Sequence, residues 1–118
     1  MSAIWLWLAA ALMAATALLH SVLGERKLIA PILALHTGVL AVPLARQVLR
    51  FGWHLTSGLM VVCAAAMIEP RSPARLIAII GSIWLLSGLA DAVYTRGRHI
   101  GWPALVAAGA FALLGSIG

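Results

Sequence analysis

The chain consists mainly of long apolar stretches separated by short clusters of charged residues. Uncharged stretches cover residues 1–24, 28–45, 51–68, 76–90 and 100–118. A bilayer core about 30 Å thick needs roughly 20 helical residues to cross it. The first stretch is long enough, and the fourth is long enough if its helix continues to Thr95. The last is a short span that begins near Pro103 as a first-turn proline. The pattern therefore predicts several membrane-crossing helices.

The region from residue 28 to residue 68 allows two interpretations, either two short spans or one span preceded by a surface segment. A hairpin at residues 46–50 would contain neither Gly nor Pro, and its residues are good helix formers. Pro43 is instead well placed to open a helix that continues through Arg50 to Ile68. Residues 28–42 then form an interfacial or re-entrant segment.

We therefore expect an all-α integral membrane four-helix bundle, built from the single domain 1–118. Its spans are expected at about 2–23, 44–68, 75–95 and 102–117, with the interfacial or re-entrant segment at about 28–42 between the first two. Four spans place six of the eight Lys and Arg on one side, whereas five spans would divide them equally. The positive-inside rule assigns the richer side to the cytoplasm, which puts both termini in the periplasm of a bacterial inner membrane.

Composition supports the membrane location and narrows the expected partners. Hydrophobic residues make up 64 % of the chain and charged residues 9 %, whereas a soluble domain carries roughly 25 % charged residues. So few charges could not cover a water-facing surface, and the lipid bilayer is the expected main partner. The net charge of +5 fits attraction to anionic lipids at the cytoplasmic face. No basic patch with interleaved aromatics is present, so we expect no nucleic-acid partner.

Ionisable residues inside or beside the spans are the first candidates for function, because such side chains are costly in lipid. His20 lies five residues before Glu25, about 7.5 Å along a helix, and His54 lies four residues after Arg50, about 6 Å. If Glu25 and Arg50 mark the membrane boundary, both His side chains lie about one turn inside it. Arg46, Arg50 and His54 also share one helix face, because they recur every four residues.

The third and fourth spans contribute two further candidates. Asp91 lies five residues before Arg96, which again places it about 7.5 Å inside the charged boundary. His99 opens the last helix near the same level. The sequence therefore predicts a layer of His, carboxylate and Arg side chains near the cytoplasmic face.

The first half of the chain resembles a group of small bacterial inner-membrane proteins. The resemblance rests on the string from His20 to Arg26, which contains a Gly-Glu-Arg turn, and on the Trp53-His54 pair followed by Ser57. It implies a four-helix membrane fold and emphasises His20, Glu25 and His54, and it carries no activity with it.

A first hypothesis for the polar layer is a membrane-embedded transition-metal or haem site. Imidazole suits Zn, Cu and Fe, and two His with one carboxylate is a known iron arrangement. The expected metal ligands are His20 and His54 with Glu25 or Asp91, and His99 is an alternate. For haem b the two spanning His side chains would be axial ligands, and the propionates would pair with Arg46 and Arg50.

Two other hypotheses stay open beside the cofactor site. Four short helices with one membrane carboxylate fit a small dimeric proton-coupled transporter or channel, with Asp91 as the exchange site, while Arg50 and His54 could hold an anion. The chain could instead be a structural accessory subunit of a larger membrane complex, in which the polar layer only locks the bundle. Neither a phosphate-binding loop nor a hydrolase motif is present, so no enzymatic activity is assigned.

Overall fold

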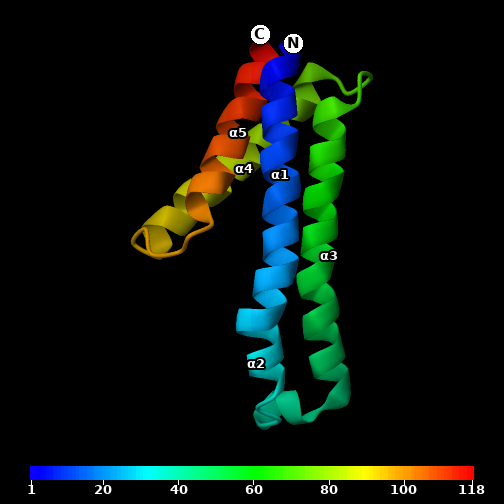
Figure 1. Cartoon of the computed structure of the whole chain (residues 1–118), viewed down its shortest axis with the longest axis vertical. Helices are drawn as coiled ribbons and strands as arrows, with labels where there is room; N and C mark the ends of the chain where they lie inside the picture. The colour runs from blue at the N-terminus through cyan, green and yellow to red at the C-terminus, as the bar shows by residue number, and fades with distance from the viewer.

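The computed structural model describes all residues from 1 to 118 and contains helices without any strand (Figure 1). The main helices are α1 (Ala3–Gly24), α3 (Pro43–Ile68), α4 (Ala74–Tyr94) and α5 (Trp102–Ile117). A π-helical turn (Glu25–Ile29), the short helix α2 (Ala30–Leu33) and a 3-10 turn (Gly38–Ala41) lie between α1 and α3. The prediction of an all-α four-helix fold is confirmed.

The first helix is longer than its expected end at residue 23. The helix α1, the π turn and α2 form one continuous rod, Ala3–Leu33, of 31 residues. Pro31 lacks an N–H, and in a regular α-helix its ring would press against the carbonyl of Lys27. The wider π turn, in which the Ala30 N–H bonds to the Glu25 carbonyl, keeps the helix continuous around this position. The expected segment 28–42 is therefore helical up to Leu33 and irregular only beyond it.

The second long helix begins where the proline pattern indicated. Pro43 occupies the first turn of α3, where a missing N–H costs nothing, and the Arg46 N–H bonds back to the Val42 carbonyl. The helix then runs without interruption through Arg50 to Ile68. A loop with positive φ at His36 and Gly38 joins it to the rod, and His36 is exposed there.

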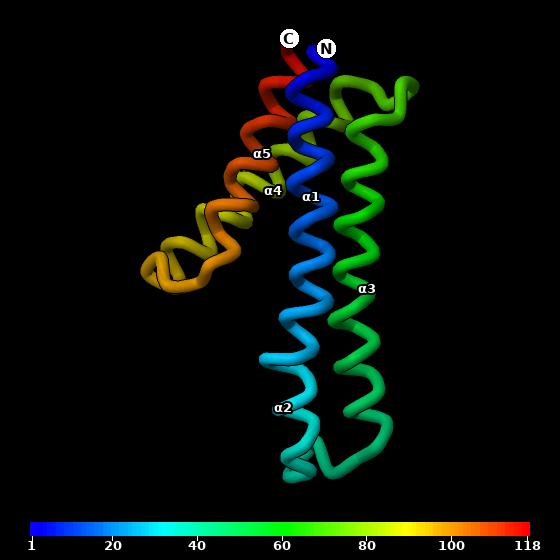
Figure 2. Tube along the Cα trace, viewed as in Figure 1, coloured from blue at the N-terminus to red at the C-terminus, as the bar shows by residue number.

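The helices form two pairs that meet near the chain termini and diverge away from them. In Figures 1 and 2, α1 and α3 lie side by side, while α4 and α5 form a hairpin that leaves this pair at an angle. The helix α1 packs against both α3 and α5, and α4 packs mainly against α5. The two termini are adjacent, because the Ser2 N–H donates to the Gly115 carbonyl at 3.0 Å. The loop between α4 and α5 therefore lies away from α1 and α3.

Small residues set the close packing of the core near the termini. A Cβ on Gly109 would lie 2.4 Å from the Leu85 nitrogen and 2.6 Å from the Gly81 carbonyl oxygen, so α4 and α5 approach backbone to backbone. Trp84 is buried in this core. The core is made of Leu6, Ala9, Ala10, Met13, Ala64, Met67, Ile77, Trp84, Ala108 and Ala112.

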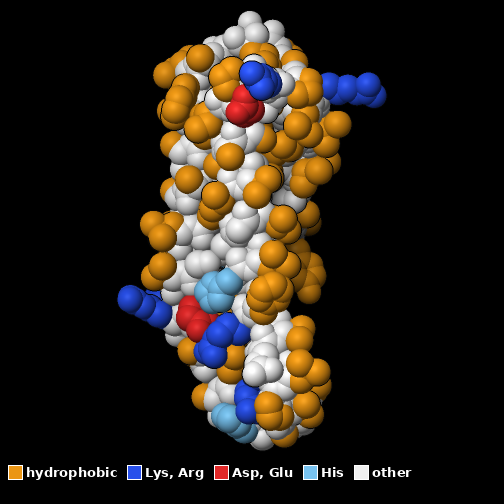
Figure 3. Space-filling model, turned by 90° about the vertical axis from the view of Figure 1, so that its right-hand side faces the viewer, with side chains coloured by type: hydrophobic (Ala, Val, Ile, Leu, Met, Phe, Trp, Pro, Cys, Tyr) orange, Lys and Arg blue, Asp and Glu red, His pale blue; other side chains and the backbone are white.

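Three helices are long and apolar enough to cross a membrane, namely Ala3–Leu33, Pro43–Ile68 and Ala74–Tyr94. The fourth, α5, is apolar but shorter, with 16 residues. Hydrophobic side chains cover much of the outer surface, and charged groups gather at a few positions (Figure 3). These features are compatible with a membrane protein.

Candidate functional site

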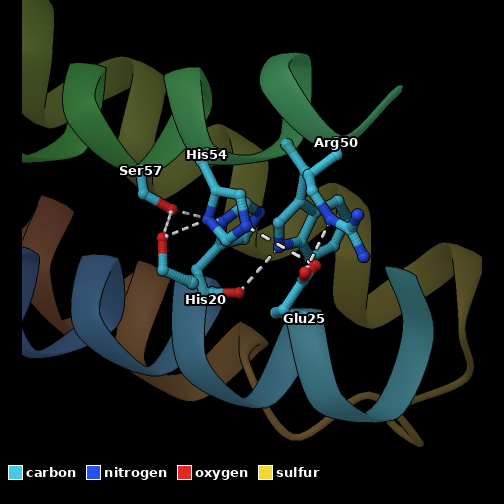
Figure 4. A network of polar contacts seen from close by, with 7 residues as sticks. His20, Glu25, Arg50, His54 and Ser57 are labelled. Carbon is cyan, nitrogen blue, oxygen red and sulfur yellow. Dashed lines mark hydrogen bonds and ion pairs between the residues drawn. The ribbon is translucent and has the colours of Figure 1, made fainter. Parts of the chain in front are cut away.

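The centre of the contact between α1 and α3 is a continuous run of polar side chains (Figure 4). The His20 Nδ1 lies 2.7 Å from the Ser57 Oγ, and the Ser21 Oγ lies 2.7 Å from the same oxygen. The Ser21 Oγ in turn lies 3.0 Å from the His54 Nδ1. Four side chains from two helices thus form one hydrogen-bonded chain with an imidazole at each end.

The run of polar side chains continues from His54 to the Glu25 carboxylate. The His54 Nε2 lies 3.5 Å from the Glu25 Oε2, and the Arg50 Nε donates to the Glu25 Oε1 at 2.7 Å. The Oε2 atom is buried and has no hydrogen-bond partner. We call the residues His20, Ser57, Ser21, His54 and Glu25 the polar chain.

Trp53 packs over one end of the polar chain and fixes the position of His20. Its indole ring stacks on the imidazole with 4.0 Å between ring centroids and 8° between planes. The indole Nε1 donates to the His20 backbone carbonyl at 2.8 Å. A Cβ on Gly24 would lie 2.4 Å from the indole, so the Gly24 backbone leaves the space that the ring occupies.

The hydrogen bonds of the polar chain can run in either of two opposite directions. Each serine hydroxyl has one proton, and a neutral imidazole donates from one nitrogen and accepts at the other. If Ser21 donates to Ser57, then Ser57 donates to the His20 Nδ1 and the His54 Nδ1–H donates to Ser21. Rotating both hydroxyls and switching both imidazoles to the other tautomer reverses every bond, so that His20 becomes the donor and His54 the acceptor.

The tautomer and protonation of His54 decide whether the Glu25 Oε2 has a donor. When His54 Nδ1 donates to Ser21, a neutral ring leaves its Nε2 as an acceptor facing the acceptor Glu25 Oε2. One additional proton on Nε2 makes the ring a cation and gives that buried oxygen a donor. Arg50 already neutralises the other oxygen. With the hydrogen bonds in the opposite direction, a neutral His54 carries its proton on Nε2 and gives the same oxygen a donor.

The predicted polar layer is divided between two separate places. Glu25, His20, His54 and Arg50 come together between α1 and α3. Asp91 lies at the end of α4 and pairs with His99, whose Nδ1 is 2.5 Å from the Asp91 Oδ2.

This second pair belongs to the hairpin that diverges from α1 and α3 (Figure 1). Because the bundle opens toward this side, equal depth along the helices does not produce one common site. Arg46 lies one turn from Arg50 on α3, and its Nη1 donates to the Leu40 carbonyl at 2.7 Å.

Three participants in the site were not predicted from the sequence. Ser21 carried no signal beyond its position next to His20, while Ser57 and Trp53 appeared only in the resemblance of the first half of the chain. In the structure Ser57 is buried and reaches His20 on the opposite helix. The Trp53 ring packs on His20. Cross-helix partners depend on the register between two helices, which sequence spacing does not determine.

The predicted cofactor sites find no support in this arrangement. No group of three or more His, Cys, Asp or Glu side chains is arranged to hold a metal ion. Both Nδ1 atoms are engaged by serine hydroxyls, and the His54 Nε2 faces Glu25 instead of His20. A haem held by both imidazoles would need one ring nitrogen of His20 and one of His54 to face each other across the porphyrin. The geometry therefore does not fit haem b.

Comparisons with protein-family models, with curated proteins and with solved structures found no match. The resemblance of the first half of the chain to small bacterial inner-membrane proteins stays a prediction. The function must therefore be inferred from the polar chain itself.

Proposed function

We propose that the chain is a multi-pass inner-membrane protein that takes up and releases protons through the polar chain, in the class of proton-coupled membrane carriers. The observation that supports this proposal is the run of hydrogen bonds from His20 through two serines to His54, whose Nε2 lies 3.5 Å from the Glu25 carboxylate. Histidine is the side chain whose protonation changes most readily near neutral pH. Ionisable chains of Asp, Glu and His within membrane helices are typical of proton relays.

The surroundings of the polar chain favour a carrier over an open channel. At the Glu25 end, the carboxylate side chain is 30 % exposed and lies beside a cluster of cationic residues. Beyond His20, toward the chain termini, the contact between α1 and α3 is closed by Ala17, Met13 and Met67, which are all buried. Protons thus have a polar route from one side only. A site that is open to one side at a time fits alternating access, in which a conformational change exposes it to the other side.

A histidine titration tests whether the two imidazoles share protons. The chain has only four histidines, so selective ¹⁵N labelling allows each one to be followed by NMR in detergent or nanodiscs. We expect His20 and His54 to titrate as a coupled pair with shared macroscopic steps. His36 and His99 lie outside the polar chain, so their signals serve as internal references.

The matched variants are Ser57→Ala and Ser116→Ala. The first removes the hydroxyl between Ser21 and His20, so the coupling between the two imidazoles should weaken. The second removes a hydroxyl that bonds only to the Leu113 carbonyl on its own helix, and it should leave all four curves unchanged. Independent curves for His20 and His54 in the unmodified protein would contradict the proposal. The polar chain would then only stabilise the packing of α1 against α3, as expected for an accessory subunit.

A further inference from the structure

A second feature of the charged end is an open recess on the first turns of α3. It has a volume of about 400 Å³ and is lined by Pro43, Arg46, Gln47, Arg50 and Phe51. The other four residues lie three, four, seven and eight positions after Pro43, so all five share one face of the helix. We call this feature the α3 recess.

The two arginines of the α3 recess are held in place by contacts outside it. The Arg46 Nη1 donates to the Leu40 carbonyl and the Arg50 Nε donates to the Glu25 carboxylate, both at 2.7 Å. A guanidinium has five N–H donors, so each contact uses only part of the group and restricts its orientation. Pre-oriented guanidinium groups lose less conformational freedom when they bind a ligand.

The charge around the α3 recess favours an anion. Between residues 24 and 50 the chain has the cations Arg26, Lys27, Arg46 and Arg50, and only one carboxylate, Glu25. The recess also lies at the N-terminal end of α3, where the helix dipole is positive. The exposed Gln47 adds an amide donor between the two arginines. No acidic side chain lines the recess.

We propose that the α3 recess binds a phosphate group. Two guanidinium groups and one amide offer more donors than the two oxygens of a carboxylate can accept, whereas a phosphate presents three or four oxygens and a larger charge. Arginine forks match phosphate geometry in pairs of parallel hydrogen bonds. The phosphate can belong to a free anion or to a lipid headgroup, since both present the same chemistry. This binding does not depend on proton exchange by the polar chain.

Two probes distinguish the source of the phosphate. In the first arm, inorganic phosphate is titrated by calorimetry into the protein in nanodiscs of phosphatidylcholine, which has no net charge. In the second arm, the protein in detergent is mixed with phosphatidic acid and phosphatidylcholine, and retained lipids are counted by native mass spectrometry. Binding in the first arm identifies a free anion, whereas selective retention of phosphatidic acid in the second arm alone identifies a lipid headgroup.

The variants Arg46→Gln and Gln47→Ala test whether either probe occupies the α3 recess. Arg46→Gln should weaken binding about tenfold or more, the loss expected for a charge-assisted hydrogen bond. Gln47→Ala removes an exposed amide that has no hydrogen bond within the protein, so it should weaken binding by a smaller factor without affecting folding. The matched control is Arg75→Gln, which removes an exposed arginine in the first turn of α4 and should leave binding unchanged. Equal binding by all four proteins, or no binding of either probe by the unmodified protein, would overturn the proposal.

Discussion

At the scale of single residues, the half-buried His20 and His54 hold each other in place. His20 contacts the Ser57 hydroxyl, His54 contacts the Ser21 hydroxyl, and the two hydroxyls are hydrogen-bonded to each other. Removal of either one leaves a hydroxyl without its partner and breaks the same chain of bonds. Their contributions to stability should therefore be shared.

This sharing predicts a non-additive double-mutant cycle. Each of His20→Ala and His54→Ala should lower the free energy of unfolding by about 1–2 kcal/mol. The double variant should lose less than the sum by about 1 kcal/mol, within the range seen for residues in one network. Thermal unfolding in detergent measures all three. The pair His20→Ala and His99→Ala is the control, because these residues lie in separate places and should be additive.

Gly24 gives a second prediction at this scale. A methyl group at this position would overlap the Trp53 indole, so Gly24→Ala should displace the ring from His20. The expected cost is about 1–3 kcal/mol, as for other overpacked sites, with a shift in tryptophan emission. Gly58→Ala on α3 is the matched control, because a Cβ there meets nothing within 4 Å. It should be neutral or stabilising by up to about 1 kcal/mol, since alanine favours helix. Equal behaviour of the two variants would show that the indole does not need Gly24.

Sequence reasoning identified the ionisable members of the site but not their neutral partners. His20, Glu25, Arg50 and His54 stood out because charged and imidazole side chains are rare and costly in an apolar chain. The serines did not stand out, because a single hydroxyl is common in membrane helices and costs little. Which serine meets which histidine depends on the rotation of α1 against α3. That rotation follows from packing of the whole interface.

At the scale of secondary-structure elements, prolines had two different effects that only their context distinguishes. Pro43 begins α3, as its position before a run of good helix formers indicated. A proline inside a helix normally interrupts it, yet the rod continues past Pro31 because a π turn precedes it. A π turn has no clear sequence signature, so the length of the rod could not be predicted from composition or hydropathy.

The position of Pro43 leads to a prediction for α3. In the first helical turn the proline ring replaces no hydrogen bond, so Pro43→Ala should change the free energy of unfolding by no more than about 0.5 kcal/mol. Val61→Pro, in the middle of the same helix, should cost about 3 kcal/mol or more. Circular dichroism during heating in detergent measures both. A clear loss of stability in Pro43→Ala would show that the ring stabilises the fold by packing instead.

At the scale of the whole molecule, the adjacent termini lead to a prediction of an even number of membrane crossings. The Ser2–Gly115 backbone hydrogen bond places both ends of the chain together, and the positive-inside rule predicts that both lie in the periplasm. Alkaline phosphatase fused to either terminus should therefore be active, and green fluorescent protein fused there should be dark. Opposite behaviour of the two termini would indicate five crossings, and reversal of both would invert the orientation while keeping four.

The unequal lengths of the apolar helices have a consequence for the surrounding lipid. The helix α1 has 22 residues before the charged π turn and is about 33 Å long, whereas α5 has 16 residues and is about 24 Å long. A hydrocarbon core about 30 Å thick matches α1 but exceeds the length of α5. We expect the bilayer to thin beside α5, at a small free-energy cost for each ångström of mismatch. Two copies that place their short sides together reduce the area of distorted lipid, so the bilayer itself should draw copies of this protein into pairs.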